Sequence, residues 1–137
     1  MPKEYLNPKD LFHSLQYGFS QVVTTSGGKT VHLSGQVGWD EREEMAVGSD
    51  LGAQLRQAVR NIETAMRAAS GSLHDVVSMR LYIVEEKRHE MHVVSGVLKE
   101  FFPVERAPAT TWIIVRGLAN EEFLIEIEAV GVIEEAA

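Results

Sequence analysis

The chain has 137 residues, of which 45% are hydrophobic, so it can bury one core but is too short for two ordinary domains. Its formal net charge of -7 argues against a nucleic-acid partner, because binding to a phosphate backbone depends on clustered lysine and arginine. It contains no cysteine, which excludes disulfides, thiolate metal ligands and cysteine nucleophiles. We therefore expect a single domain over residues 1–137, with an N-terminal arm (1–16) and a core (17–133).

The first residues, MPKEYLNPKD, carry charges and two prolines where a signal peptide would have an apolar segment. No later stretch approaches the roughly 18 apolar residues of a membrane span. We expect a cytoplasmic protein with no membrane partner.

The segment GFSQVVTTSGGKTVHLSGQVGW contains two β-rich runs separated by SGGK, a two-glycine turn signal. It predicts a β-hairpin with strands at about 19–25 and 30–39. The charged run that follows, DEREEMAVGSD, is typical of a solvated loop.

An amphipathic helix is predicted from Leu51 onward, because apolar residues recur every three or four positions as far as Ala69. Arginine and glutamate fall between them, on the opposite face. Ser49 or Asp50 can cap the start of this helix and Gly71 its end.

The next two elements are a strand and a second helix. DVVSMRLYIVE alternates between apolar residues such as Leu81 and polar ones such as Arg80, which indicates a half-buried strand. From Met91 the apolar residues return to helical spacing, and Pro103 prevents the helix from continuing. A helix is therefore expected over about 86–102.

Two strands close the chain, ATTWIIV and FLIEIEAVGVI, joined by RGLANEE. The predicted order is therefore β-β-α-β-α-β-β. This order favours an α+β domain in which one mixed sheet is covered by two helices on one face.

The last strand is apolar on both of its faces. Ile125 and Ile127 lie on one face, while Leu124 and Val130 lie on the other. Because two helices cover only one face, we expect the uncovered face to be buried by self-association.

Two carboxylates, Glu126 and Glu128, share the face opposite Ile125 and Ile127, with side chains about 7 Å apart at the usual strand rise. In a partly dry cleft, such a pair would raise the pKa of one carboxyl and provide a general acid or base. On an outer face, the same pair would simply be two solvated charges.

Histidines give no metal site. His89 and His92 lie on one helix face in HEMH, but the zinc-protease pattern places its histidines four apart and no third ligand is evident. His13, His32 and His74 stand alone and are expected to pack or to be solvated.

The glycines of SGQVG, residues 34–38, indicate a strand bulge or a close approach of the backbone to another group. The segment lacks the lysine and the glycine spacing of a phosphate-binding loop. It can instead form the edge of a small-molecule pocket.

Several stretches together resemble one family. They are GFSQVV, LSGQVGW, AASGSLHDVV, LYIV, FFPVERAPATT and LIEIEAVGVI, and the resemblance runs from about residue 17 to 133. The family is the Rid/YjgF family of reactive-intermediate imine/enamine deaminases, also labelled L-PSP or translation-inhibitor proteins. The EIEA motif and the SGQ strand are fairly specific in combination.

The resemblance implies a chorismate-mutase-like fold and a homotrimer with an inner barrel of sheets and clefts between neighbouring subunits. In deaminating members, an arginine binds the carboxylate of an imine derived from an amino acid, and a glutamate positions the attacking water. Glu126, the first carboxylate of EIEA, matches that glutamate and is the expected catalytic residue. The backbone of Ser34, Gly35 and Gln36 is expected to contact the substrate. Neither a cofactor nor a metal is implied.

This chain departs from the family pattern at the arginine. In deaminating members the arginine follows a proline and an alanine, whereas PATT places Thr110 there, followed by Thr111. Arg106 lies four residues earlier, roughly 13 Å away in an extended chain, although a bend at Pro108 would shorten that path. All three of Arg106, Thr110 and Thr111 are therefore candidate substrate-binding residues.

A second departure is at Phe19, where GFSQVV replaces the usual PYSQAV and a cleft tyrosine loses its hydroxyl. Phe19 is still expected to contact the substrate through its ring. Without a guanidinium, an anionic substrate loses the donor that binds and orients its carboxylate. Trp39 and Trp112 can line a more apolar cleft or pack in the core.

Three functions follow, in this order. The first is cofactor-free hydrolysis of a small-molecule imine or enamine to a carbonyl compound and ammonia. The second is a trimeric small-molecule-binding or regulatory protein that has lost the reaction. The third, endoribonuclease activity, fits the acidic charge poorly.

Overall fold

The computed structural model describes residues 3–135. It is an α+β domain with one mixed sheet and two α-helices, as the sequence predicted. The elements are β1 (Glu4–Leu6), β2 (Val22–Thr24), β3 (Lys29–Gln36), α1 (Leu51–Ala68), β4 (Val76–Val84), α2 (Met91–Phe101), β5 (Ala109–Val115) and β6 (Ile125–Ile133). Four 3-10 turns connect them: η1 (Ser14–Tyr17), η2 (Leu73–Asp75), η3 (Glu85–Glu90) and η4 (Val104–Arg106).

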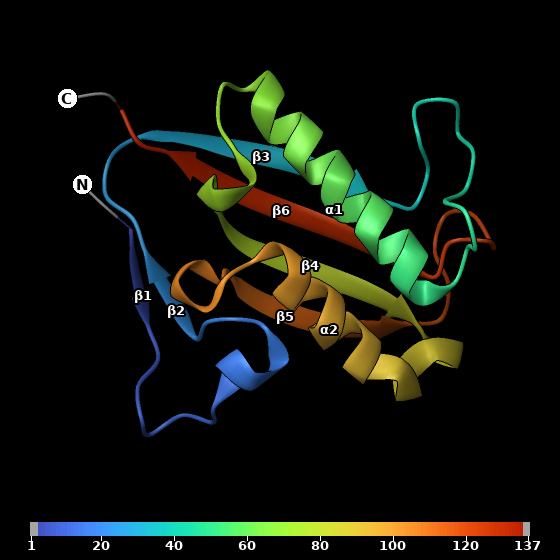
Figure 1. Ribbon diagram of the computed structural model, residues 1–137, viewed down its shortest axis with the longest axis horizontal. Helices are drawn as coiled ribbons and strands as arrows, with labels where there is room; N and C mark the ends of the chain where they lie inside the picture. The colour runs from blue at the N-terminus through green and yellow to red at the C-terminus, as the bar shows by residue number, and fades with distance from the viewer. Residues whose placement is uncertain (1–2, 136–137) are drawn as a thin grey trace.

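The main sheet has the strand order β3-β6-β4-β5. Strands β4 and β5 are parallel, and the other neighbours are antiparallel. Both helices cross the same face of this sheet (Figure 1). The opposite face, which we call the open face, is covered by no helix of the described chain.

The predicted hairpin between β2 and β3 is wrong. The chain does turn at Gly27 and Gly28, which both have positive φ, but β2 then pairs with β1, a strand in the segment that the sequence analysis assigned to the N-terminal arm. Strand β3 pairs instead with β6, from Lys29 opposite Ile133 onward. Burial explains the outcome, since Val31 and Leu33 reach the core under α1 only when β3 lies beside β6.

Helix α1 begins where the sequence predicted, because the Asp50 carboxylate accepts a hydrogen bond from the Ala53 N–H. Its end differs, since the left-handed residue is Ser70 rather than Gly71. Gly71 is needed for space instead: a Cβ there would lie 2.7 Å from Cδ1 of Ile133.

The core lies between the sheet and the inner faces of both helices. Helix α1 contributes an apolar stripe that includes Leu55, Val59, Ile62 and Met66, all inaccessible to solvent. A Cβ on Gly131 would overlap the end of the Met66 side chain, so this glycine allows α1 to pack closely on β6.

The second predicted helix, over 86–102, is divided in the structure. Its first part is the 3-10 turn η3, in which no residue is buried, and the α-helix starts only at Met91. The α-helical part, α2, buries Val94, Val97 and Leu98. It is helical because these residues pack on the core, which stabilises a helix more than its local sequence does.

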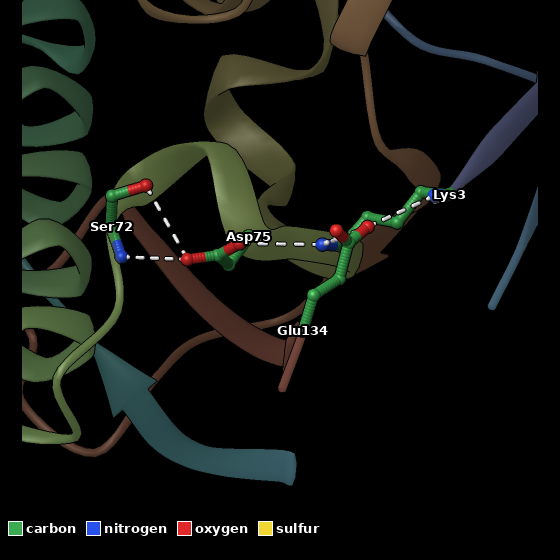
Figure 2. A network of polar contacts seen from close by, with 4 residues as sticks. All are labelled: Lys3, Ser72, Asp75 and Glu134. Carbon is green, nitrogen blue, oxygen red and sulfur yellow. Dashed lines mark hydrogen bonds and ion pairs between the residues drawn. The ribbon is translucent and has the colours of Figure 1, made fainter. Parts of the chain in front are cut away.

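The N-terminal arm is fixed to the core by a polar network (Figure 2). The Lys3 ammonium donates to the Asp75 carboxylate at 3.3 Å, and the Lys3 backbone N–H donates to Glu134 at 3.2 Å. Asp75 also accepts the Ser72 N–H at 2.9 Å, so it closes a capping box in η2 at the same time. The arm is therefore part of the folded domain, and the Lys3 side chain is only 8% exposed.

Candidate functional site

The predicted site residues lie on two faces of the sheet. Residues paired across neighbouring strands point to the same face of a sheet. Tyr82 pairs with Glu126 on β6 and with Ile113 on β5, so these three side chains share one face. Trp112, the neighbour of Ile113, packs against the core beneath the helices. By alternation, Glu126 points to the open face, whereas Thr110 and Trp112 point to the helix side.

One group of predicted residues meets on the open face, where β3 is irregular. The register of β3 against β6 shifts between Leu33 and Gln36, which leaves Ser34 and Gly35 outside the regular ladder. The Glu126 carboxylate lies directly against Gly35, and any Cβ at that position would overlap it. We call Ser34, Gly35 and Glu126 the Glu126 group. Gln36 pairs with Ile127, so its side chain points to the helix side, where it lines a cavity beside α1.

Helix α1 holds the chain on either side of this group. Asn61 donates to the carbonyls of Val37 and Trp39, both at 2.9 Å. The backbone of Gly38 packs on Gln54, close enough that a Cβ would lie 2.9 Å from the Gln54 Cα. The segment that leaves β3 is therefore supported by two polar side chains of the helix.

The Gln54 side chain also fixes the start of β6. It is 1% exposed, donates to the carbonyls of Ser49 and Glu122, and accepts the Leu124 N–H at 2.9 Å. The sequence analysis missed Gln54 and Asn61. The signal for Gln54 was a polar residue between Leu51 and Leu55 on the apolar stripe.

The second carboxylate of EIEA has different surroundings. Glu128 accepts a hydrogen bond from the Tyr82 hydroxyl, and its Oε1 lies 3.7 Å from Nη1 of Arg80. The hydrogen bond to Glu128 raises the pKa of Tyr82 above its usual value. Glu128 thus contacts two side chains of β4. Glu126 instead lies against Gly35, where the register of β3 shifts. The two glutamates are not equivalent, which the sequence alone left open.

A second group lines a cavity of about 660 Å³ on the helix side, between β5, α2 and η1. Phe19 and Trp112 form one corner, with ring centroids 5.8 Å apart at 56°. The Trp112 indole N–H donates to the Thr110 hydroxyl at 3.0 Å. We call this cavity the aromatic pocket. It is lined by Gln16, Tyr17, Phe19, Met91, His92, Ser95, Gly96, Lys99, Thr110 and Trp112.

The structure separates Arg106 from the two threonines. Thr110 lines the aromatic pocket, and Thr111 points to the open face beside Arg80. Both threonines also line a cavity of about 500 Å³ on the open face. Arg106 is exposed in η4 and lines neither group. Its charge acts on Tyr5: burial raises the pKa of Tyr5, and the Arg106 guanidinium opposes that rise. Arg106 therefore lies towards the N-terminal strand in its own chain.

Within residues 3–135, no three His, Asp or Glu side chains are grouped so as to hold a metal ion. Over the same residues, no helix has the length and apolar character needed to cross a membrane.

These features define an α+β protein with a glutamate on its open sheet face and an aromatic pocket on its helix side. The sequence profile of the family described as Endoribonuclease L-PSP matches residues 13–133. The chain belongs to this family, the Rid/YjgF family.

Two relatives carry named activities. The chain is 31% identical over 116 residues to a 2-iminobutanoate/2-iminopropanoate deaminase from Dermatophagoides farinae, covering 85% of this chain and 86% of that one. It is 31% identical over 130 residues to the 3-aminoacrylate deaminase RutC from Acinetobacter baylyi, covering 95% and 98%.

Among solved structures, the Rid-family protein YyfB from Yersinia pestis matches with a TM-score of 0.90 at 33% identity, over 97% of this chain and 100% of that one. RidA from an Antarctic Psychrobacter matches with a TM-score of 0.70 at 31% identity, over 84% and 88%. The family expected from the sequence is therefore confirmed, as is an α+β fold with two helices and a mixed sheet that matches Rid-family structures.

Proposed function

We propose that this protein hydrolyses a reactive imine or enamine to a carbonyl compound and ammonia, without a cofactor. The observation that carries the proposal is the Glu126 carboxylate lying against Gly35 on the open face. The activities of the two deaminase relatives, each 31% identical, support the choice of reaction.

In the proposed reaction, Glu126 orients a water molecule and accepts its proton as the oxygen attacks the imine carbon. The proton then passes to the nitrogen, the carbon–nitrogen bond breaks, and a carbonyl compound and ammonia leave. An enamine first takes a proton on carbon to become the imine. The backbone at Ser34 and Gly35, which lies outside the regular ladder, would bind the substrate beside Glu126.

We further propose that the active unit is a homotrimer and that each cleft combines two chains. In one chain the Glu126 group and the aromatic pocket face opposite sides of the sheet, so a single copy cannot present both to one small molecule. A neighbouring copy packed on the open face would bring its own Phe19 and Thr110 to Glu126. Arg106 would contact a substrate only across such an interface, and Thr111 would lie at its edge.

The test is ammonia release from freshly generated imines by the wild type and Glu126→Gln. We expect the substitution to lower kcat by about 100-fold or more, because it removes a general base.

Glu63→Gln, on helix α1 and paired with Arg67, is the matched control and should retain activity. Sedimentation must show the same assembly for all three proteins. Full turnover by Glu126→Gln would refute the mechanism.

A trimeric ligand-binding protein without turnover is the second candidate. It is favoured by Thr110, whose hydroxyl is hydrogen-bonded to Trp112 at the position where deaminating relatives are expected to have an arginine. Stabilisation by imine-derived carboxylates with no ammonia release from any imine would select this function.

A further inference from the structure

The lining of the aromatic pocket indicates what kind of group it accepts. Three of its residues, Tyr17, Phe19 and Trp112, present benzene or indole rings, and Met91 presents a thioether. The two rings nearest β5 meet at an angle, so a flat group can stack on one and touch the edge of the other. At about 660 Å³, the cavity lies in the range that holds drug-sized ligands, well beyond the needs of a methyl or ethyl group.

One polar atom of this corner is already paired. The indole N–H of Trp112 donates to the Thr110 hydroxyl at 3.0 Å, so the indole needs no ligand as its acceptor. The Thr110 hydroxyl keeps its own proton and can still donate to a ligand. The ring of Trp112 therefore presents an apolar surface beside one hydroxyl donor.

The pocket is lined by one lysine and no carboxylate, although the chain carries a net charge of -7. No Asp or Glu is among its lining residues, whereas Lys99 and His92 are. Lys99 lies in the last turn of α2, and its Cγ packs close to Gly18, at 3.5 Å from where a Cβ would be. The ion pairs found within residues 3–135 do not include Lys99. Its ammonium is thus available to an anionic ligand.

We infer that the pocket selects imines with an aromatic side chain, and that Lys99 binds their carboxylate in place of the arginine that this chain lacks at Thr110. The inference rests on the proposed function and names its substrate class. The step balances as imine plus water giving an aromatic 2-oxo acid plus ammonia: the carbon–nitrogen double bond breaks and the water oxygen becomes the new carbonyl oxygen.

The experiment compares imines generated in place by an amino-acid oxidase from phenylalanine and from alanine, together with a carboxylate-free imine generated from benzylamine. We expect kcat/KM for the phenylalanine imine to exceed that for the alanine imine by about 10-fold or more, given the value of burying one ring. Lys99→Gln should lower kcat/KM for the phenylalanine imine by about 10-fold, mainly through KM, because it removes a charge-assisted bond. It should change the benzylamine imine less than about two-fold.

Lys9→Gln, at an exposed lysine that does not line the pocket, is the matched control and should leave all three rates unchanged. A preference for the alanine imine would overturn the substrate class. Equal effects of Lys99→Gln on imines with and without a carboxylate would overturn the role of Lys99.

A binding measurement separates this inference from the proposed function. Calorimetry with 3-phenylpropanoate should show binding that weakens by about 10-fold in Lys99→Gln and not in Lys9→Gln. If no imine is hydrolysed but this binding pattern holds, the proposed function fails and the pocket assignment stands. If imines are hydrolysed but 3-phenylpropanoate binds equally to both variants, the pocket assignment fails alone.

Discussion

At the scale of single residues, one contact distinguishes the two glutamates of EIEA. Glu126 lies against Gly35, at the point of β3 where the register against β6 shifts. Glu128, two residues further on, accepts the Tyr82 hydroxyl and lies beside Arg80. Glu128 also lines a cavity of about 500 Å³ on the open face, together with Arg80 and Thr111. The two glutamates therefore differ in their contacts: Glu126 lies against the backbone of β3, and Glu128 is paired with side chains of β4.

Tyr82 provides a pH prediction at this scale. Its pKa is raised above 10.0, chiefly because the hydroxyl donates to Glu128, so folding favours the protonated form. The contribution of this hydrogen bond to the stability of the folded state is fully present below pH 10. It is lost as the pH rises through the pKa that Tyr82 has in the folded state. Ultraviolet titration should show the Tyr82 phenolate appearing above pH 10, as the difference between the wild type and Tyr82→Phe.

Glu128→Gln is the decisive variant for this prediction. It removes the charge that opposes phenolate formation, so the Tyr82 transition should move down towards 10. A transition at the same pH in both proteins would show that the hydroxyl does not depend on Glu128.

At the scale of elements, α1 both forms the core and fixes the surroundings of the site. Its apolar stripe packs on the sheet, while Gln54 and Asn61 bind the backbone that follows β3 and precedes β6. The loops around the Glu126 group therefore take their positions from a rigid helix, as sites need for a defined geometry.

Gln54→Leu tests this support. Leucine fills a similar volume but cannot make the hydrogen bonds to Ser49, Glu122 and Leu124, which leaves buried backbone groups unpaired. We expect the free energy of unfolding to fall by about 2–4 kcal/mol, measured in urea at equal protein concentration.

The control for this prediction is Gln57→Leu on the same helix, which removes one side-chain bond to Asn61 and should cost about 0.5 kcal/mol or less. Equal urea midpoints for the wild type and Gln54→Leu would contradict the role assigned to Gln54.

At the scale of the whole molecule, the open face decides how the protein works. It carries Arg80, Tyr82 and Thr111 beside the Glu126 group, and these polar residues are interspersed with apolar ones such as Ile113 and Val130. A face of mixed polar and apolar residues is typical of an interface between protein subunits and not of a fully apolar core. It therefore suits contact with another copy of the chain. The proposed trimer would use it to join two incomplete sites.

Subunit mixing tests this arrangement. In the proposed cleft, one chain supplies Glu126 and its neighbour supplies Phe19, so Glu126→Gln and Phe19→Ala each disable one half of every cleft. In a mixed trimer, some clefts combine Glu126 from a Phe19→Ala chain with Phe19 from a Glu126→Gln chain and are intact. After the two proteins exchange subunits, random mixing should restore up to about one quarter of the wild-type sites. The measurement is ammonia release before and after exchange, with native mass spectrometry to show the mixed trimers. Exchange without any recovery would place the whole site in one chain.

The sequence alone determined the elements with a strong period. Burial of one face imposes a repeat of 3.6 residues on α1 and alternation on β4, and the Asp50 cap is a local interaction, so each could be predicted without knowing the rest of the chain. The motifs at residues 34–36 and 126–128 likewise placed the chain in its family.

Only the tertiary structure decided which segments meet. The turn after β2 was visible in the sequence, but the partner of β3 depended on what β6 and α1 could bury together, which is a long-range matter. For the same reason, the sequence could assign Phe19, Thr110 and Glu126 to strands or turns. It could not tell to which face of the sheet each of these side chains points. Register determines the face of every side chain, and register is set by packing between distant segments.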